Sequence, residues 1–311
     1  MQATIRSVVA LTLLAIAAAN GDPHVSTFVE MSRTVNAGDA KGYARLYAAD
    51  ATISIAGGAP LKGRAAIERY EIDLLRQYPG TQLAFYAMWN DGEQAVVHYA
   101  VNGATTTGQK MGHEGLLFYR FRKSGLIAEE RRYNDSMTPM AQLGMFGSAP
   151  ARALPDLPTE MKSIVARGAP RELANVAIVR AHYAAWNSHD QARLLSTMSD
   201  DAVLDELTSP EPFTGRRGVT AWFDSWARAV PDAKADVTYI HGVGDFVLVE
   251  SIVRGTLNGT IGRISAATKP FVVHRATIVE LKGGKIVRLS AFMNGKELAQ
   301  AVGEWPPKPA K

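Results

Sequence analysis

The hydrophobic pattern of the chain predicts two kinds of element in a fixed order. Residues 25–36 place Phe28, Met31 and Val35 at helical spacing, so that one face of a helix is apolar. The run EGLLFYRFR at 114–122 is rich in β-forming residues and lies between glycine turns, as expected of a strand. Because helices come first and long hairpin-connected strands follow, the pattern indicates an α+β layer fold.

The same order of elements occurs twice along the chain. Residues 176–187 repeat the apolar helical spacing of residues 25–36, and both segments end in Asn-x-x-Asp. The two aspartates, Asp39 and Asp190, are expected to cap a second, short helix. Further pairs keep an offset of 151 or 152 residues, and later of 159: Asp50 and Asp201, Gly63 and Gly215, Pro79 and Pro231, Gly92 and Gly244, Gly103 and Gly255, Gly125 and Gly284, Gly144 and Gly303. Register held over roughly 110 residues indicates a duplication.

The change of offset indicates an insertion of about seven residues in the second copy. It falls in a predicted hairpin, which spans Ala104–Gly112 in the first copy and Thr256–Phe271 in the second. The chain then divides into a first domain at 22–146, a linker at 147–172, a second domain at 173–305 and a tail at 306–311. The linker is rich in alanine and proline, and we expect it to hold one or two helical turns.

The first twenty residues have the pattern of an export signal. Arg6 gives a short basic region, and Val8–Ala19 is an apolar run that ends in three alanines, which a signal peptidase can cleave. We expect residues 1–20 to be removed near Ala19 or Asn20, which leaves an exported protein, periplasmic or secreted, with no membrane segment. The alternative is a misassigned start followed by an ordinary apolar helix.

Composition disfavours several classes of function. With 47% apolar and 21% charged residues and a formal net charge of +4, the chain is typical of a globular protein. Its basic residues are scattered, and the densest group is interpreted as a solvated face rather than a nucleic-acid site. The absence of cysteine excludes disulfides and thiolate metal sites. The sequence holds no phosphate loop, dinucleotide fingerprint or nucleophile elbow, which disfavours phosphoryl transfer, hydride transfer and serine hydrolysis.

The element order and several motifs together resemble a known family. The second copy carries FTGRRGVTAWFDSWARAVPDAKADV at 213–237, RGTLNG at 254–259 and LKGGKIVRLSAFMNGKELAQAVG at 281–303, and the first carries LKGRAAIERY at 61–70 and YNDSMTPMAQLG at 133–144. Each copy resembles the SnoaL-like (polyketide cyclase, ester cyclase) branch of the nuclear transport factor 2-like superfamily, over about 240 residues in total. The resemblance implies two tandem cone-shaped α+β barrels. It does not fix the reaction, because this fold hosts isomerases, dehydratases, hydrolases, cyclases and non-catalytic binders.

Members of this family usually pair sheet to sheet as dimers, and a tandem chain can form such a pair internally. A flexible linker of about 27 residues, at roughly 5–6 Å times the square root of its length, reaches about 30 Å. We therefore expect an intrachain pseudo-dimer, and further self-association is left open.

Asp135 is the first catalytic candidate. The resemblance implies that an aspartate on the last strand moves a proton next to a carbonyl, and Asp135 falls on that position. An apolar pocket raises the pKa of a carboxyl group, so that it exchanges protons near neutral pH. Glu129, Arg131 and Tyr133 alternate onto the same face of the strand. The alternative is that Asp135 only caps the turn after the strand.

His98, His113 and Tyr43 are the other catalytic candidates. The two histidines flank a short connection between predicted strands, and if both point inward they form a dyad that relays a proton or polarises a carbonyl. This arrangement is similar to the histidine pair of scytalone dehydratase-type members. Tyr43 is a candidate donor to an oxyanion, as in ketosteroid isomerase-type sites. The alternatives are hydrogen-bonded or surface histidines and a core tyrosine.

The remaining candidates are predicted to contact a ligand: Tyr47, Trp89 and Tyr133 in the first copy, and Trp222, Trp226, His274 and Asn294 in the second. Asn294 replaces Asp135 in the second copy, and asparagine cannot act as a general base at neutral pH. Glu250 and Val272 likewise replace the two histidines, so the second copy is expected to serve stability or ligand binding. No metal and no cofactor is expected, because no tight metal-ligand spacing occurs.

The sequence therefore predicts an exported, cofactor-free isomerase, dehydratase or cyclase, whose first domain transfers protons on a small, mainly apolar carbonyl compound. The alternative is a non-catalytic small-ligand-binding or interaction protein of the same fold. A third interpretation is a structural pseudo-dimer whose pockets are filled by side chains.

Overall fold

The computed structural model of the chain describes residues 22–147 and 150–306. The predicted signal peptide at 1–20 lies outside the described residues, as does the tail beyond residue 306. Contacts divide the described chain into two compact units. The first comprises residues 22–54, 59–132 and 154–165, and the second comprises residues 55–58, 133–147, 150–153 and 166–306. The end of the first sequence copy thus belongs to the second unit, and the internal pairing of the two sheets stays a prediction.

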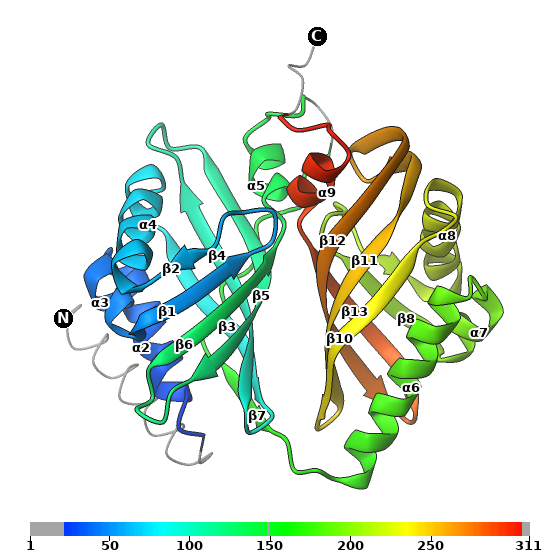
Figure 1. Ribbon diagram of the computed structural model, residues 1–311, viewed down its shortest axis with the longest axis horizontal. Coiled ribbons are helices and arrows are strands. Elements are labelled where there is room, and N and C mark those ends of the chain that lie inside the picture. The colour runs from blue at the N-terminus through cyan, green and yellow to red at the C-terminus, as the bar shows by residue number, and fades with distance from the viewer. Residues whose placement is uncertain (1–21, 148–149, 307–311) are drawn as a thin grey trace. The chain divides into compact units, whose positions relative to one another are not determined.

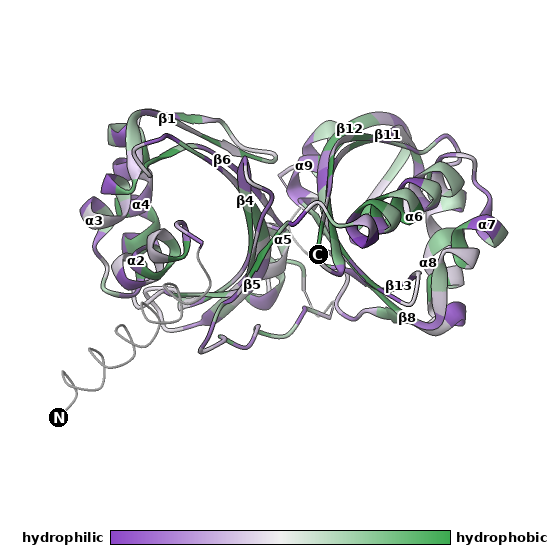
Figure 2. Ribbon diagram, turned by 90° about the horizontal axis from the view of Figure 1, so that it is seen from below, coloured by the Kyte–Doolittle hydropathy of each residue, from purple (hydrophilic) through white to green (hydrophobic). Residues whose placement is uncertain are grey.

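The first unit is a curved sheet with three helices against its concave side (Figure 2). The helices are α2 (Val25–Asn36), α3 (Ala40–Arg45) and α4 (Arg64–Gln77). The strands are β1 (Tyr47–Ile55), β2 (Leu61–Lys62), β3 (Gln82–Asn90), β4 (Gln94–Ala104), β5 (Lys110–Phe121), β6 (Ile127–Asn134) and β7 (Lys162–Val165), in the order β2-β1-β6-β5-β4-β3-β7. The apolar face predicted for α2 is confirmed, because Phe28, Met31 and Val35 are all buried. The Asp39 carboxylate accepts from the Gly42 N–H at 2.8 Å, which confirms the predicted cap of α3.

The predicted linker contributes a strand instead of the helical turns expected from its sequence. Strand β7 pairs in parallel with β3, with Lys162 opposite Ala87 and Val165 opposite Asn90. None of the described linker residues before Pro170, where the next helix begins, is helical. The expectation of helical turns was wrong because a free sheet edge offers backbone partners that a local reading of composition does not reveal.

The second unit repeats the plan with a six-stranded sheet (Figure 1). Its helices are α5 (Met137–Gln142), α6 (Pro170–Asn187), α7 (Gln191–Ser196), α8 (Gly215–Ala229) and α9 (Gly295–Ala301). Its strands are β8 (Met198–Glu206), β9 (Phe213–Thr214), β10 (Lys234–Val243), β11 (Phe246–Ile261), β12 (Ile264–Lys282) and β13 (Lys285–Met293), in the order β10-β11-β12-β13-β8-β9. The Asp190 carboxylate accepts from the Arg193 N–H at 2.9 Å, which confirms the second predicted cap. The predicted insertion lengthens the β11–β12 hairpin, whose tip lies at Ile261–Ile264.

Both halves are thus α+β, with a mixed, curved sheet folded around helices, as the fold prediction requires. Each sheet contains a parallel strand pair, β3 with β7 in the first and β8 with β13 in the second. Among the described strands neither sheet closes into a full barrel.

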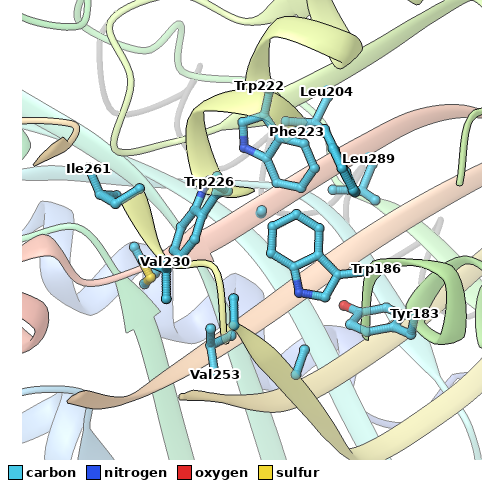
Figure 3. Close-up of a cluster of buried hydrophobic side chains, with 14 of the residues drawn as sticks. Tyr183, Trp186, Leu204, Trp222, Phe223, Trp226, Val230, Val253, Ile261 and Leu289 are labelled. Atoms are coloured by element: carbon cyan, nitrogen blue, oxygen red, sulfur yellow. The ribbon is translucent and has the colours of Figure 1, made fainter. Parts of the chain in front are cut away.

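Tryptophan side chains from α6 and α8 fill the interior of the second unit (Figure 3). The Trp186 ring stacks on the Trp222 ring at 4.9 Å and meets the Trp226 ring edge-on at 5.8 Å. Each aromatic side chain of this size buries a large apolar area, so the cluster holds the helices against the sheet. Trp222 and Trp226, predicted to contact a ligand, are each 3% exposed within this core.

Candidate functional site

The strand register places His98 and His113 on opposite faces of the first sheet. His98 lies opposite Leu116, and His113 lies opposite Val101. Residues directly opposite each other share a face, whereas His98 and Val101 are three residues apart on one strand and point to opposite faces. The predicted histidine dyad is therefore wrong.

The two histidines have separate partners. His98 Nε2 donates to Glu114 Oε2 at 2.8 Å, and its ring lies 4.6 Å from the ring of Tyr86. His113 Nε2 lies 3.2 Å from the Tyr99 hydroxyl, while His113 Nδ1 is buried with no hydrogen-bond partner among the described residues. Burial lowers the pKa of His113 to about 4, so the ring is neutral at neutral pH.

The inner face of the first unit carries a closed ring of hydrogen bonds. Arg132 of β6 donates through Nη2 to the Tyr43 hydroxyl at 2.8 Å and through Nε to Glu130. Tyr47 donates to the other carboxylate oxygen of Glu130, and its hydroxyl lies 2.7 Å from that of Tyr43. All four side chains are at most 13% exposed, so the ring lies in a low-dielectric interior where such bonds strengthen.

This ring occupies the two tyrosines that were predicted to face a substrate. Because Tyr47 gives its proton to Glu130, Tyr43 must be the donor between the two hydroxyls. Burial raises the pKa of Tyr43 and the pKa of Tyr47 well above the usual value for a tyrosine. Tyr43 can donate to an oxyanion only if its bond to Tyr47 breaks.

Glu71 of α4 faces the same interior and was missed by sequence reasoning. Glu71 is 3% exposed, and its carboxyl group has no hydrogen-bond partner among the described residues. Burial raises its pKa from 4.5 to about 7, the Arg132 charge opposes the rise, and the Glu130 charge adds to it. The spacing held a signal, because Glu71 follows the fully buried Ile67 by one helical turn and so shares its face.

Glu129, Arg131 and Tyr133, the β6 residues that alternate with Asp135, point to the outer face of the sheet, opposite to the face of Glu130 and Arg132. Arg131 donates to Glu129 at 2.7 Å and to Gln94 at 2.6 Å. Tyr133, predicted to contact a ligand, donates to Glu250 at 2.7 Å. The sequence interpretation therefore selected the outer set of this strand, whereas Glu130 and Arg132 form the inner set.

Asp135 lies in the second unit and is held by three donors. Its Oδ1 accepts from the Met137 N–H at 3.1 Å and the Gly295 N–H at 2.9 Å, and its Oδ2 accepts from the Thr138 hydroxyl at 2.7 Å. Burial raises the pKa of Asp135, and these hydrogen bonds oppose the rise. The carboxylate thus caps the start of α5 and reaches the first residue of α9.

Asn294, the equivalent of Asp135 in the second copy, makes the reciprocal contacts. Its Oδ1 accepts from the Lys296 N–H in its own helix and from the Ser136 N–H beside Asp135, both at 3.1 Å. Its Nδ2 donates to the Ala56 carbonyl at 2.7 Å and to the Ser136 hydroxyl at 3.1 Å. The two positions therefore cap one another's helices, as the capping interpretation of Asp135 expects.

The last two ligand candidates occupy different environments. Trp89 is 3% exposed and buried in the first unit. The His274 side chain is 53% exposed, and its Nδ1 lies 2.7 Å from Glu297 Oε1. This hydrogen bond raises the pKa of His274. Neither residue belongs to the hydrogen-bonded ring of the first unit.

Residues 22–147 and 150–306 show neither a cluster of potential metal ligands nor a helix suited to a membrane. These residues contain no group of three or more histidine, cysteine, aspartate or glutamate side chains placed to hold a metal ion. None of their helices combines the length and the apolar character that crossing a membrane requires.

A family model described as the SnoaL-like domain matches the chain twice, at residues 27–130 and 179–289, which together exceed half of its length. The chain belongs to the SnoaL-like domain family. No curated protein matches it.

Several solved structures are similar to one SnoaL-like repeat of the chain. A proposed SnoaL-like polyketide cyclase from Jannaschia sp. CCS1 is 19% identical, over 45% of this chain and 97% of that chain, with a TM-score of 0.41. AclR, a proposed hydroxylase from Streptomyces galilaeus, is 20% identical over 44% of this chain and 90% of that chain, with a TM-score of 0.39. A protein with a ketosteroid isomerase-like fold from Catenulispora acidiphila DSM 44928, in complex with trimethylamine, is 23% identical over 42% of this chain and 97% of that chain, with a TM-score of 0.37. At these values the similarity carries no information about the reaction.

Each SnoaL-like repeat buries a glutamate–arginine pair beside the same helix position. With the offset of 152 residues, Tyr70 of α4 corresponds to Trp222 of α8. The Arg132 guanidinium lies 5.7 Å from the Tyr70 ring centre, and that of Arg275 lies 5.8 Å from the Trp222 ring centre. Arg275 donates to Glu206 at 3.1 Å, and burial raises the pKa of this carboxyl. The arginines come from strands that do not correspond, β6 and β12, so the arrangement was not simply copied.

The two SnoaL-like repeats differ at the next helix position. Phe223 occupies the position that Glu71 has in the first repeat. Only the first of these two positions therefore carries a carboxyl, and burial raises the pKa of that carboxyl to about 7.

Proposed function

We propose that the first unit catalyses a cofactor-free proton transfer, of the isomerase, dehydratase or cyclase type, on a small, mainly apolar carbonyl compound. The observation that carries the proposal is Glu71, a buried carboxyl with a pKa of about 7 on the inner face of a SnoaL-like repeat. A group with that pKa gives and takes protons with similar ease at neutral pH, which suits general acid–base catalysis.

In this proposal the Glu71 carboxylate removes a proton from the carbon next to the carbonyl and returns it to another atom of the same compound. The electron pair of the broken C–H bond moves toward the carbonyl oxygen, so no oxidant or reductant is needed. His113 donates a hydrogen bond to that oxygen through Nδ1. When the Tyr99 hydroxyl donates to His113 Nε2, the neutral ring carries its proton on Nδ1, which has no other partner among the described residues. The Arg132 charge opposes the rise that burial causes in the pKa of both Glu71 and Tyr99.

Asp135 has a structural role in this proposal. Its two carboxylate oxygens already accept from Met137, Thr138 and Gly295, so proton abstraction by Asp135 requires the loss of helix caps. Glu71 has no such bonds to break.

The proposal is tested with 1-tetralone, an apolar ketone, in heavy water, with mass spectrometry of the deuterium incorporated next to the carbonyl. The Glu71→Gln variant should exchange at least about 100-fold more slowly than wild type, since a positioned acid–base group contributes that much or more. Asp73→Asn is the matched control, because Asp73 is on the same helix with its side chain 74% exposed. Equal exchange by wild type and Glu71→Gln would contradict the proposal.

A second candidate is non-catalytic binding of a small ligand. It is favoured by the closed hydrogen-bond ring of the first unit and the tryptophan-filled interior of the second, since both have the character of a structural core. The two candidates differ in the fate of the bound compound, which a binder releases without isotope exchange.

A further inference from the structure

A hollow of about 620 Å³ opens on the second unit, within the size range of small-molecule pockets. Four segments line it: the turn after α5, the tip of the β11–β12 hairpin, the loop between β8 and β9, and the end of α9 with residues 304–305. Its apolar lining includes Met137, Met145, Phe146, Ile264, Ala299 and Trp305. The hollow therefore offers an apolar surface of ligand size within the second unit.

The hollow continues into a narrower recess. The recess shares Met137, Arg263 and Ile264 with the hollow and adds the buried apolar side chains of Met293 and Leu298. The recess also has polar lining, which includes Asp135, Thr138 and Arg152. An occupant of the hollow can thus extend an apolar group toward the recess.

Three of the four charged residues that line the hollow and the recess have hydrogen-bond partners within the protein. Asp135 accepts from three donors, and Arg152 donates to Asp205 at 2.9 Å and to the Ser209 carbonyl at 3.2 Å. Arg263 donates to the Pro150 carbonyl and lies over the Phe146 ring at 5.7 Å. The fourth charged residue, Glu304, is itself negative. An anionic ligand would therefore have to be desolvated without a free counter-charge, which is costly, whereas an apolar ligand gains from leaving water.

The hairpin tip that forms one wall is specific to the second repeat. Residues Ile261–Ile264 lie in the insertion of about seven residues that lengthens β11 and β12. The corresponding hairpin of the first repeat ends earlier, in a turn at Thr105–Gly108. The insertion thus builds a wall for which the first repeat has no equivalent.

We propose that the second unit binds an uncharged, mainly apolar small molecule in this hollow. The site is separate from the proposed proton-transfer site and does not depend on it. The second unit is therefore a ligand-binding module with its own site.

The test uses N-phenyl-1-naphthylamine, an uncharged apolar dye, with the full chain, and measures dye fluorescence excited through tryptophan. Trp305 lines the hollow and is a suitable energy donor. We expect saturable binding, with weaker binding of 1-anilinonaphthalene-8-sulfonate, which has the same aromatic body and one negative charge. Absence of saturable dye binding, or tighter binding of the sulfonate, would overturn the proposal.

Two variants locate the dye. Met145→Glu puts a charge into the hollow at a residue that is 51% exposed, so the fold should tolerate it, and the dissociation constant should rise by about 10-fold or more. Val272→Glu is the matched control, at a 58% exposed apolar residue of the same unit that does not line the hollow, and it should bind as wild type. Equal binding by both variants would place the dye elsewhere. Glu71→Gln should leave dye binding unchanged, which keeps this test independent of the catalytic one.

Discussion

At the scale of single residues, the difference between Asp135 and Asn294 follows from the hydrogen bonds each must make. Asp135 meets only donors, and a carboxylate accepts at both oxygens. Asn294 meets two backbone donors on one side and the Ala56 carbonyl on the other, so it must both accept and donate. Helix capping thus accounts for both identities without reference to catalysis.

This account predicts an asymmetric response to exchanging the two side chains. Asn294→Asp should destabilise the second unit by about 1–3 kcal/mol, because a carboxylate oxygen would face the Ala56 carbonyl. Asp135→Asn should destabilise the second unit less. The amide oxygen of the new asparagine can still accept from the Gly295 N–H, and the Thr138 hydroxyl can turn to accept from the new NH₂ group. Urea unfolding of both variants measures the order, and a larger loss for Asp135→Asn would contradict it.

At the scale of elements, the positions of strands were predictable and their faces were not. Alternating β-rich runs and glycine turns located β4 and β5 well enough to pair them. Register decides which face a side chain takes, and a shift of one residue inverts every assignment. His98 and His113 are therefore outer and inner residues of neighbouring strands, a result that depends on the pairing of His113 with Val101.

Elements of the second unit are joined by the buried pair of Glu206 on β8 and Arg275 on β12. Arg275→Met should cost about 3–5 kcal/mol because it leaves a buried carboxylate without its counter-charge. The double variant with Glu206→Gln should cost much less than the sum of the single changes. The matched control is the exposed pair of Arg254 and Asp236, whose coupling should stay below about 1 kcal/mol. Additive costs at the buried pair, measured by chemical unfolding, would contradict this account.

At the scale of the whole molecule, the duplication, the α+β class and the family could be predicted from the sequence. Matched glycines, prolines and caps keep an offset of 151 or 152 residues before the insertion and of 159 after it, which reports on backbone geometry shared by the two copies. Glu130 and Arg132 could not be predicted, because they look like surface residues until the strand face is known, whereas helical spacing from Ile67 held a signal for Glu71. Export and internal pairing stay predictions; N-terminal sequencing of the protein from its host's exported fraction would test the first.

The central claim also has a thermodynamic consequence for the whole chain. The pKa of Glu71 is higher in the folded state, at about 7, than its ordinary value of 4.5. The folded state therefore binds more protons between these values, so stability is fully present below about pH 4.5 and falls as pH rises through about 7. The change attributable to this group is about 3 kcal/mol, and it should be absent in Glu71→Gln.

The most direct measurement is an NMR titration of the Glu71 side-chain carboxyl in protein labelled with ¹³C at glutamate, with its signal assigned by comparison with Glu71→Gln. The account predicts a midpoint near pH 7. A midpoint near 4.5 would show that the carboxyl is ionised and solvated at neutral pH, and would contradict its role as the acid–base group of the first unit.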